Sequence, residues 1–348
     1  MKQINWPSLS VVIVTKNNER TLPRLVKDLE KQDYPRNKLE VIIIDGNSTD
    51  RTREIVDSSS LKMRFKIGKV PGDPEVCKGE GLSLAKGEIV ALIDSDNYFP
   101  KKNWFKDLVI PLMSDKSIVG SYTWRFAYNR KDNFWNRYFS LIGSADPVGL
   151  YLKKADKLSY ISDKWTGTGK LVEDKDSYFI VEFNQKNFPT LGSNGFFARR
   201  RILIKGKSDP QHFFHIDTPY DLLRFGYNRY AVVKDVVIHD TAVTFIPYLK
   251  KRAKYMQLHY QKRSRQRRYK VFDPSRNQDI FRIILFIILS ITFIQPLYVS
   301  FRGFLRLKDW AWFLHPIFCF SIMITYVIAV VLKTLVNPYG KKINEYKK

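Results

Sequence analysis

The chain contains very little cysteine, and its N-terminus lacks the features of a secretory signal. Only two cysteines occur among its 348 residues, Cys77 and Cys319, and they lie in very different sequence contexts. This shortage excludes a disulfide framework and a cysteine-based zinc site. Because no basic segment followed by a short apolar run stands at the N-terminus, we expect no signal peptide. The sequence also lacks internal repeats and low-complexity tracts.

Acidic residues are scarce relative to basic ones. The chain has 34 Asp and Glu against 59 Lys and Arg, a formal net charge of +25. Residues 246–348 alone hold 20 basic and 4 acidic residues, so a net charge of +16 lies near the C-terminus. Basic chains of this kind bind nucleic acid or anionic membranes. Since this charge flanks long apolar runs, we expect an anionic lipid bilayer, and no nucleic acid, as the partner.

Strand-like and helical patterns alternate through the first hundred residues. Helical spacing is clearest at Leu22, Leu25 and Leu29. An unbroken apolar run suits a strand that is covered on both faces. Together these patterns predict an α/β fold with a mainly parallel sheet, flanking helices and right-handed crossovers. The expected strands are residues 9–15, 39–44, 63–70 and 89–93.

Two carboxylates, Asp94 and Asp96, follow the last of these strands. In open α/β sheets, ligands bind at the carboxyl ends of the strands. Carboxylates one residue apart can hold a hard divalent cation, and Mg²⁺ keeps water and substrate phosphate in its coordination shell. The alternative is a capped turn between strand and helix, because Asp, Ser and Asn all favour turns.

Four sequence blocks in this region resemble the family 2 glycosyltransferases with the GT-A fold. The order and spacing of the blocks match that family over roughly residues 8–240. The resemblance implies a Rossmann-like sheet and a sugar transfer from a nucleotide-sugar donor. One departure is Gly46, where the family often has a second aspartate, so contacts of residue 46 with the nucleotide base are not expected. The four blocks are residues 10–19, 44–50, 85–88 and 94–96.

The resemblance implies that the nucleotide lies over the ends of the first two strands. Asp45 would accept a hydrogen bond from a base N–H, or would serve only as a turn cap. Lys78 would reach a phosphate, or would be solvated. Gly195, in a glycine-containing block, would allow the backbone to approach a sugar or phosphate closely. The implied donor-binding residues are Thr15, Asn17, Glu19, Asp45, Lys78, Asp94 and Gly195.

The same resemblance implies a divalent metal, Mg²⁺ or Mn²⁺, at the donor diphosphate. Its implied ligands are Asp94, Asp96 and His239. A metal there neutralises the leaving group as charge develops on it. The alternatives are that Asp94 faces the ribose and that His239 is an ordinary residue at a strand end.

Residues 213–223 resemble the block that carries the general base in this family. Ile216 replaces the usual glutamate, and Asp217 remains as the candidate catalytic base. An inverting transfer needs one carboxylate to take the proton of the acceptor. Three alternatives stay open. Asp217 caps a helix before Pro219, Asp221 is the base, or an ionised phosphate acceptor needs no strong base.

The sequence changes character after residue 245, where we expect the catalytic domain to end. Residues 246–279 are expected to form a basic amphipathic helix and a linker, with the helix at 248–269. Ten Lys and Arg and no acid lie between residues 250 and 270, as in helices that lie on anionic membranes. A solvated helix or a nucleic-acid patch is the alternative. Because arginine binds phosphate bidentately, the candidates for contact with an acceptor phosphate are Arg263, Arg265, Arg267 and Arg268.

Two apolar segments, residues 283–301 and 310–332, dominate the last part of the chain, residues 280–348. As helices they would span about 29 and 35 Å, against a hydrocarbon core of about 30 Å. We therefore predict a transmembrane hairpin, with kinks at Pro296 and Pro316. The basic segments on both sides would share the cytoplasmic face, which predicts an integral membrane protein with a cytoplasmic catalytic domain.

The sequence as a whole favours an inverting, metal-dependent glycosyltransferase with a membrane-lipid acceptor, in the first place a polyprenyl phosphate. A lipid-linked or cell-surface glycan is the alternative acceptor. A non-catalytic membrane scaffold of the same fold is the alternative of another class. A processive polymerase is not indicated, because the Gln-x-x-Arg-Trp block of such relatives is missing: residues 257–268 lack the tryptophan.

Overall fold

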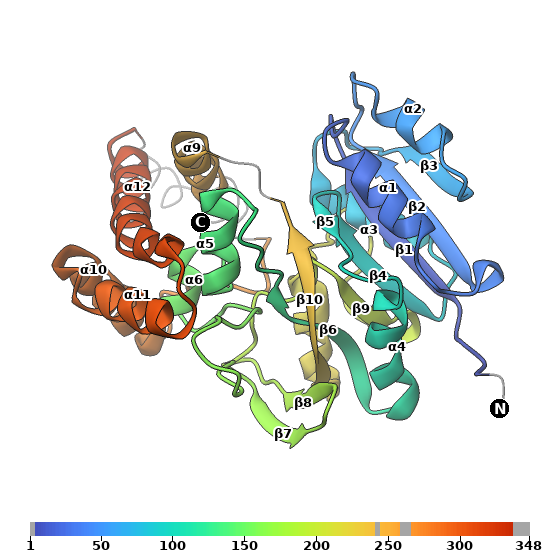
Figure 1. The fold of residues 1–348 in the computed structure, drawn as a ribbon. Coiled ribbons are helices and arrows are strands. Elements are labelled where there is room, and N and C mark those ends of the chain that lie inside the picture. The colour runs from blue at the N-terminus through green and yellow to red at the C-terminus, as the bar shows by residue number, and fades with distance from the viewer. Residues whose placement is uncertain (1–3, 241–243, 258–265, 337–348) are drawn as a thin grey trace, which may run out of the picture. The chain divides into compact units, whose positions relative to one another are not determined.

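The computed structural model describes residues 4–240, 244–257 and 266–336, with side chains described up to residue 331 (Figure 1). The chain divides into two compact units, each described here by itself. The first unit consists of Met1–Ser144 and Lys153–Thr241, and the second of Ala145–Leu152 and Ala242–Lys348.

The first unit is a sheet with helices on its faces (Figure 1). Its main helices and strands, in chain order, are β1 (Leu9–Thr15), α1 (Leu22–Glu30), β2 (Leu39–Asp45), α2 (Thr52–Asp57), β3 (Met63–Ile67), α3 (Pro74–Leu84), β4 (Ile89–Asp94), β5 (Asn97–Tyr98), α4 (Trp104–Ser114), β6 (Ile118–Phe126), α5 (Phe134–Ile142), β7 (Lys170–Asp174), β8 (Tyr178–Glu182), β9 (Phe196–Arg199), α7 (Arg200–Leu203), α8 (Asp217–Leu222) and β10 (Arg229–His239).

The strand order of the sheet is β3-β2-β1-β4-β9-β6-β10-β8-β7, and β5 pairs with β10 beside this path. β1, β2, β3 and β4 are mutually parallel, so the α/β class predicted from the first hundred residues is confirmed. The later strands make the sheet mixed. β9 lies antiparallel between β4 and β6, and β7 and β8 are also antiparallel.

The register of the parallel strands brings their polar ends to one edge. Thr15 pairs with Asp45, and Val14 pairs with both Ile44 and Asp94. Most residues before these ends in β1, β2 and β4 are apolar and buried; Ile13 and Ile93, for example, are almost inaccessible to solvent. Burial on both faces fixes the register, because a slip of one residue would move side chains to the wrong face.

A glycine next to β9 allows the chain to pass close to a buried tryptophan. Gly195 has a φ of +79°, and a Cβ built on it would lie 2.7 Å from Cη2 of Trp104. Trp104 is fully buried, and its indole nitrogen donates a hydrogen bond of 2.8 Å to the carbonyl of Val236. Gly195 therefore fits tightly against Trp104.

The second unit is helical. It differs from the prediction in the basic helix and in the first of the two apolar segments. α9 ends at Tyr255, residues 256 and 257 continue as a π-helical turn, and residues 266–276 form no helix. The predicted helix at 248–269 therefore does not extend to residue 269. Its elements are α6 (Pro147–Tyr151), α9 (Phe245–Tyr255), α10 (Asn277–Thr292), α11 (Ile294–Arg306), a 3₁₀ turn (Trp310–Phe313) and α12 (Leu314–Val336).

The predicted helix at 283–301 is interrupted at Phe293, which has a φ of +59°. α10 and α11 are bent by 76° at this break. The break has a local cause, because the ring of Pro296 would clash with the carbonyl of Thr292 four residues earlier in a continuous helix. Pro316, by contrast, lies in the first turn of α12, where proline is tolerated and the predicted kink is absent.

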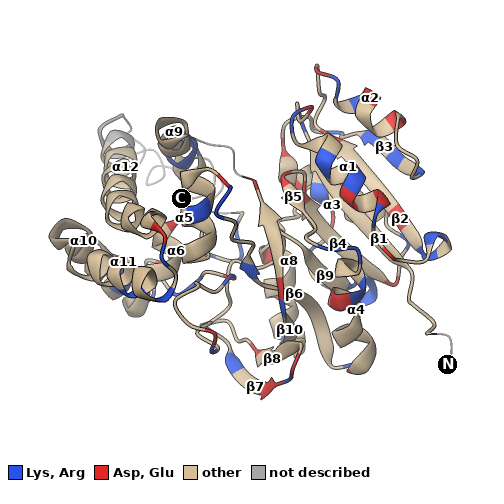
Figure 2. Cartoon of the chain, viewed as in Figure 1, with Lys and Arg blue, Asp and Glu red and all other residues tan. Residues whose placement is uncertain are grey.

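Among the described residues, one segment is long and apolar enough to cross a membrane alone, namely Trp310–Val331. α10 and α11 pass the same test only when the bent pair is taken together. Figure 2 shows α12 as a helix with almost no charged side chains. Length and composition thus allow one span, or two if the bent pair counts as one.

We predict that Gly195→Ala destabilises the first unit more than a matched change, Gly226→Ala. Both glycines have nearly the same positive φ, but a Cβ on Gly226 would meet no atom within 4 Å. Gly226→Ala should cost about 1 kcal/mol of backbone strain, whereas Gly195→Ala adds an overpacking cost of about 1–3 kcal/mol. Denaturant unfolding of the two variants measures the difference. Equal shifts of the midpoint would show that Trp104 gives way without cost.

Candidate functional site

Side chains after β1 and β2 tie the two strand ends together. Asn17, which has a φ of +50°, donates its backbone N–H to Oγ of Ser48 at 2.8 Å and accepts a hydrogen bond from the N–H of Thr49 at 2.9 Å. The carboxylate of Asp45 accepts hydrogen bonds from the backbone N–H and the hydroxyl of Ser48, at 2.7 and 2.5 Å. Asp45 therefore fills the turn-capping role, and Asn17 joins the two loops.

Thr15 and Glu19, two further donor-binding candidates, differ in their surroundings. Thr15 is buried, and its hydroxyl accepts a hydrogen bond of 3.1 Å from the amide of Asn18. Glu19 faces solvent and pairs with Nε of Arg51 at 3.3 Å. Because exposed ion pairs contribute little to stability, Glu19 is not held by its surroundings as Thr15 is.

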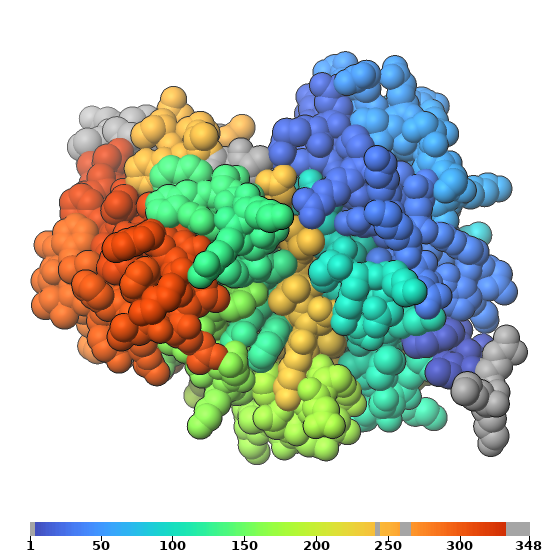
Figure 3. Space-filling view, viewed as in Figure 1, coloured from blue at the N-terminus to red at the C-terminus, as the bar shows by residue number. Residues whose placement is uncertain are grey.

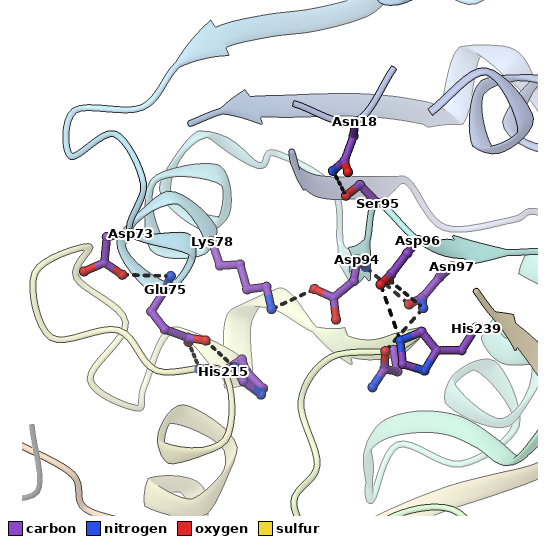
Figure 4. Close-up of polar contacts among 11 residues, drawn as sticks. Asn18, Asp73, Glu75, Lys78, Asp94, Ser95, Asp96, Asn97, His215 and His239 are labelled. Carbon is purple, nitrogen blue, oxygen red and sulfur yellow. Dashed lines mark hydrogen bonds and ion pairs between the residues drawn. The ribbon is translucent and has the colours of Figure 1, made fainter. Parts of the chain in front are cut away.

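Lys78 and Asp94 form an ion pair at the end of β4. Nζ of Lys78, which is buried, lies 2.8 Å from Oδ1 of the partly exposed Asp94 (Figure 4). Burial alone would raise the pKa of Asp94, but the ammonium group of Lys78 outweighs burial and holds the pKa below its ordinary value. The sequence analysis assigned both residues to the site, and the structure shows that they bind each other.

Asp96 and His239 meet because β5 pairs with the end of β10. His239 lies opposite Asn97 in this pairing, and its Nε2 is 3.5 Å from Oδ2 of Asp96 (Figure 4). The amide of Asn97 donates to Asp96 at 3.4 Å and to Asn194 at 3.3 Å. The Asp96 and His239 side chains are 33% and 16% exposed, so both can reach a ligand at this edge.

These two residues fit a divalent metal that keeps substrate oxygens in its shell. No three His, Cys, Asp or Glu side chains among the described residues are grouped closely enough to hold a metal on their own. Mg²⁺ needs no such cage, since one or two protein ligands plus substrate phosphates are its usual arrangement. The structure therefore offers Asp96 and His239 as ligands, whereas Asp94, the third predicted ligand, is engaged by Lys78.

The predicted base, Asp217, is the first residue of α8 and is 0% exposed. Asp221, the alternative base, is also buried, and its Oδ2 accepts a hydrogen bond of 3.2 Å from the N–H of Lys207. A general base must come within hydrogen-bond reach of the proton that it takes. In this structure, neither carboxylate is open to an acceptor.

The sequence analysis missed a carboxylate–imidazole pair, Glu75 and His215. The buried Glu75 accepts hydrogen bonds from Nδ1 and the backbone N–H of His215, at 2.7 and 2.8 Å (Figure 4). Burial would raise the pKa of Glu75, but His215 and Lys78 outweigh it and lower the pKa. A signal was present, because Asp73-Pro74 is a helix start. The side chain of Asp73 caps α3, which begins one turn earlier than Lys78.

Gly195 and the predicted arginines complete the set of candidates. Gly195 follows Asn194, which accepts a hydrogen bond from Asn97, and a Cβ on Gly195 would meet Trp104. Arg267 and Arg268 lie in the irregular segment of the second unit. Arg263 and Arg265 lie outside the described residues.

Comparisons with known proteins bear on residues in the first half of the chain. Residues 10–171 match the sequence model of glycosyl transferase family 2. Over 96 residues the chain is 35% identical to the poly(ribitol-phosphate) beta-N-acetylglucosaminyltransferase TarS of Staphylococcus aureus. This aligned stretch covers 27% of this chain and 17% of that protein. Over 140 residues it is 29% identical to the beta-monoglucosyldiacylglycerol synthase of Nostoc sp., which covers 39% and 30%.

A third relative is the GalNAc(5)-diNAcBac-PP-undecaprenol beta-1,3-glucosyltransferase of Campylobacter jejuni, 33% identical over 96 residues, or 26% of this chain and 30% of that protein. The chain thus spans less than a third of the length of each of these three relatives.

Solved structures with a similar chain path are distant in sequence. The mannosyltransferase PcManGT from Pyrobaculum calidifontis, in complex with GDP-Man and Mn²⁺, has a TM-score of 0.49 at 16% identity and covers 92% of this chain and 87% of its own. TarS residues 1–349 from S. aureus have a TM-score of 0.47 at 16% identity, covering 95% and 92%. These likenesses are too distant to specify a substrate.

The family match begins within β1 and includes β2, β3 and β4, with Asp94 at the end of β4 and Asp96 after it. It agrees with the parallel strand ends and with the carboxylates that those strands bring to one edge. Residues 10–171 are therefore a glycosyl transferase family 2 domain.

Proposed function

We propose that the protein is an inverting, metal-dependent glycosyltransferase that moves a sugar from a nucleotide-sugar donor to a membrane-lipid acceptor. The acceptor would be a polyprenyl phosphate or a lipid-linked glycan, met at the cytoplasmic face. The observation that carries this proposal is the cluster of Lys78, Asp94, Asp96 and His239 at one edge of the sheet in a family 2 domain.

In this proposal Asp96 and His239 hold Mg²⁺ or Mn²⁺ at the donor diphosphate. When bound, such an ion neutralises the charge that develops on the leaving group. Lys78 keeps Asp94 ionised and fixed, so that its remaining oxygen can position the donor. The loops after β1 and β2 would form a rigid floor for the nucleotide, because Asn17 bonds to Ser48 and Thr49 and Asp45 also bonds to Ser48.

The lipid acceptor is supported by the names of two relatives and by the surface of the second unit. One relative is named for glucosyldiacylglycerol and another for an undecaprenol-linked glycan. In the second unit, large apolar side chains are exposed along three helices, whose atoms are orange to red in Figure 3. Exposed apolar side chains in such number favour a membrane or protein contact. They include Ile284, Ile288, Ile291, Ile294, Tyr298, Phe301, Leu305, Ile324, Val327 and Ile328.

Within this proposal α12 spans the bilayer, and the bent pair α10–α11 is a broken span or lies within one leaflet. The basic segment before α10 would face anionic lipid, where each Lys or Arg contributes about 1 kcal/mol. Arg267 and Arg268, together with Arg263 and Arg265, would contact the phosphate of the acceptor. Arginine suits this role because its planar group binds phosphate bidentately.

A second candidate function is a membrane scaffold that keeps the fold without catalysis. It is favoured by Ile216 in place of the usual glutamate and by the burial of Asp217. Hydrolysis of UDP- and GDP-sugars by the purified protein with Mg²⁺ or Mn²⁺ separates the two functions. A scaffold would release no nucleotide from any donor.

We predict that Asp96→Asn lowers metal-dependent donor turnover by about 10²-fold or more, because one metal ligand and one negative charge are lost. Asp57→Asn serves as the matched control, since that carboxylate is exposed on α2 and pairs with Arg53. Nucleotide release with Mn²⁺ is measured for both variants. Full activity of Asp96→Asn would remove this residue from the proposed site.

Replacing Lys78 by Met should destabilise the first unit at pH 7, because Asp94 would keep its charge without a partner. Breaking a buried pair costs about 3–5 kcal/mol, and the partial exposure of Asp94 should reduce this cost. Denaturant unfolding measures it. The double variant with Asp94→Asn should recover much of the loss, whereas a double variant as unstable as the single one would mean that the loss comes from packing.

The pH dependence of this effect has a defined sign. In the native protein the pKa of Asp94 is lowered, so its stabilising effect is present above the pKa of an unfolded aspartate, about 3.9, and is lost as the pH falls below it. In Lys78→Met, burial acts without the ammonium group and raises the pKa of Asp94. The deficit of the variant should therefore shrink as the pH is lowered from 7 towards 4.

Membrane binding should weaken when charge is placed on the apolar face of α10. We predict that Ile288→Glu with Ile291→Glu lowers the fraction of full-length protein that floats with anionic vesicles, because each charge costs about 2.5–3.5 kcal/mol inside a bilayer. Phe225→Glu is the control, since that exposed phenylalanine belongs to the first unit. Unchanged flotation of the double variant would mean that this face does not contact lipid.

A further inference from the structure

Glu75 and His215 form a carboxylate–imidazole pair that none of the roles above uses. The side chain of Glu75 is 8% exposed and that of His215 is 22% exposed. Glu75 takes two hydrogen bonds from His215, one from the ring and one from the backbone. The pair therefore fixes both the position of residue 215 and the orientation of its ring.

Two glycines allow close packing around His215, Gly79 of α3 and Gly192 in the loop before β9. A Cβ on Gly79 would lie 2.7 Å from Cβ of Phe213, and a Cβ on Gly192 would lie 1.8 Å from the carbonyl oxygen of His215. Gly192 also has a φ of +132°, which other residues rarely adopt. The fold thus leaves no room for a side chain at either contact, and this close packing holds His215 on Glu75.

The pair belongs to the same region as the ion pair at the end of β4. Lys78 follows Glu75 by one turn of α3 and bonds Asp94 (Figure 4). Lys78 contributes to the lowered pKa of Glu75, so the two pairs are close enough to influence each other. His215 is the more exposed member of its pair.

The hydrogen bond to Glu75 determines the protonation of the imidazole ring. The pKa of Glu75 is lowered, so its carboxylate is ionised and can only accept hydrogen bonds. Nδ1 of His215 must then carry the hydrogen, which leaves the lone pair of the neutral ring on Nε2. A carboxylate in this position also stabilises the imidazolium that forms when Nε2 takes a proton.

We propose that His215, oriented by Glu75, is the general base of the transfer and that the acceptor is a hydroxyl group. This inference rests on the proposed glycosyltransferase function. The acceptor O–H bond breaks and its proton moves to Nε2 of His215. The acceptor oxygen forms a bond to the anomeric carbon of the donor sugar. The bond from that carbon to the phosphate oxygen breaks, and its electrons leave with the nucleoside diphosphate.

The burial of Asp217 supports this assignment, because a carboxylate with no exposed surface cannot meet an acceptor in this conformation. Glu75 is a positioning residue here, since it acts through the ring of His215. The inference also decides between the two proposed acceptors. A hydroxyl of a lipid or glycan needs a base, whereas an ionised polyprenyl phosphate does not.

Chemical rescue of His215→Ala tests the proposal on the full-length protein. Water is the hydroxyl acceptor in this assay, and nucleotide release from UDP- and GDP-sugars with Mn²⁺ is the readout. We expect turnover to fall by about 10²–10⁴-fold with the donor KM unchanged, and added imidazole to restore part of the turnover. Glu75→Gln should lower turnover without rescue by imidazole, because the ring of His215 is still present.

His212→Ala is the matched control. His212 makes the same contact, Nδ1 to a carboxylate oxygen of Asp209 at 2.8 Å, but on the exposed surface, so its loss should leave turnover unchanged. Thermal unfolding of His215→Ala and of a second variant, His215→Gln, confirms that both are folded.

Three outcomes would overturn the proposal. One is wild-type turnover in folded His215→Ala and His215→Gln. Another is a raised donor KM without rescue, which would make His215 a phosphate ligand. The third is a wild-type protein that glycosylates polyprenyl phosphate but no hydroxyl of a lipid extract. If the wild type uses no donor at all, the proposed glycosyltransferase function has failed instead.

Discussion

The site depends on the register of the parallel strands. Because Val14 pairs with both Ile44 and Asp94, the ends of β1, β2 and β4 coincide at one edge, and every polar group discussed above is placed relative to them. The buried apolar residues of these strands hold the register, since a slip of one residue would turn them to the other face of the sheet. The chemistry at the edge is therefore fixed by packing several residues away from it.

Charges at this edge are arranged in compensating pairs. Glu75 faces His215, Lys78 faces Asp94, and Asp96 faces His239. Isolated charges at this depth would be expensive, and pairing reduces that cost. The pairs differ in what they leave available. Lys78 and Asp94 satisfy each other closely, whereas Asp96 and His239 are 3.5 Å apart and more open. The tight pair organises the site, and the open pair is suited to a ligand.

Much of the first unit could be predicted from the sequence, because its signals are local. The apolar runs gave the strands, and the polar residues that follow them gave Asp45, Asp94 and Asp96 at one edge. The hydrogen bond between His215 and Glu75 could not be predicted, because the two residues are 140 positions apart in the sequence. They meet because glycines permit close packing around His215. The burial of Asp217 depends equally on tertiary packing. In the second unit, hydropathy recorded the apolar composition of 283–301 but not the break at Phe293.

The pairing of β5 with β10 has a consequence for the order in which the protein is made. Asp96 leaves the ribosome more than a hundred residues before His239, and β5 has only two residues, with no partner until β10 is synthesised. A nascent chain that ends at residue 171 contains the whole family match and both aspartates, but neither His215 nor His239. This edge of the sheet is therefore completed only late in translation, and an incomplete chain carries the family 2 domain without the groups that β10 and the segment before α8 add to the edge.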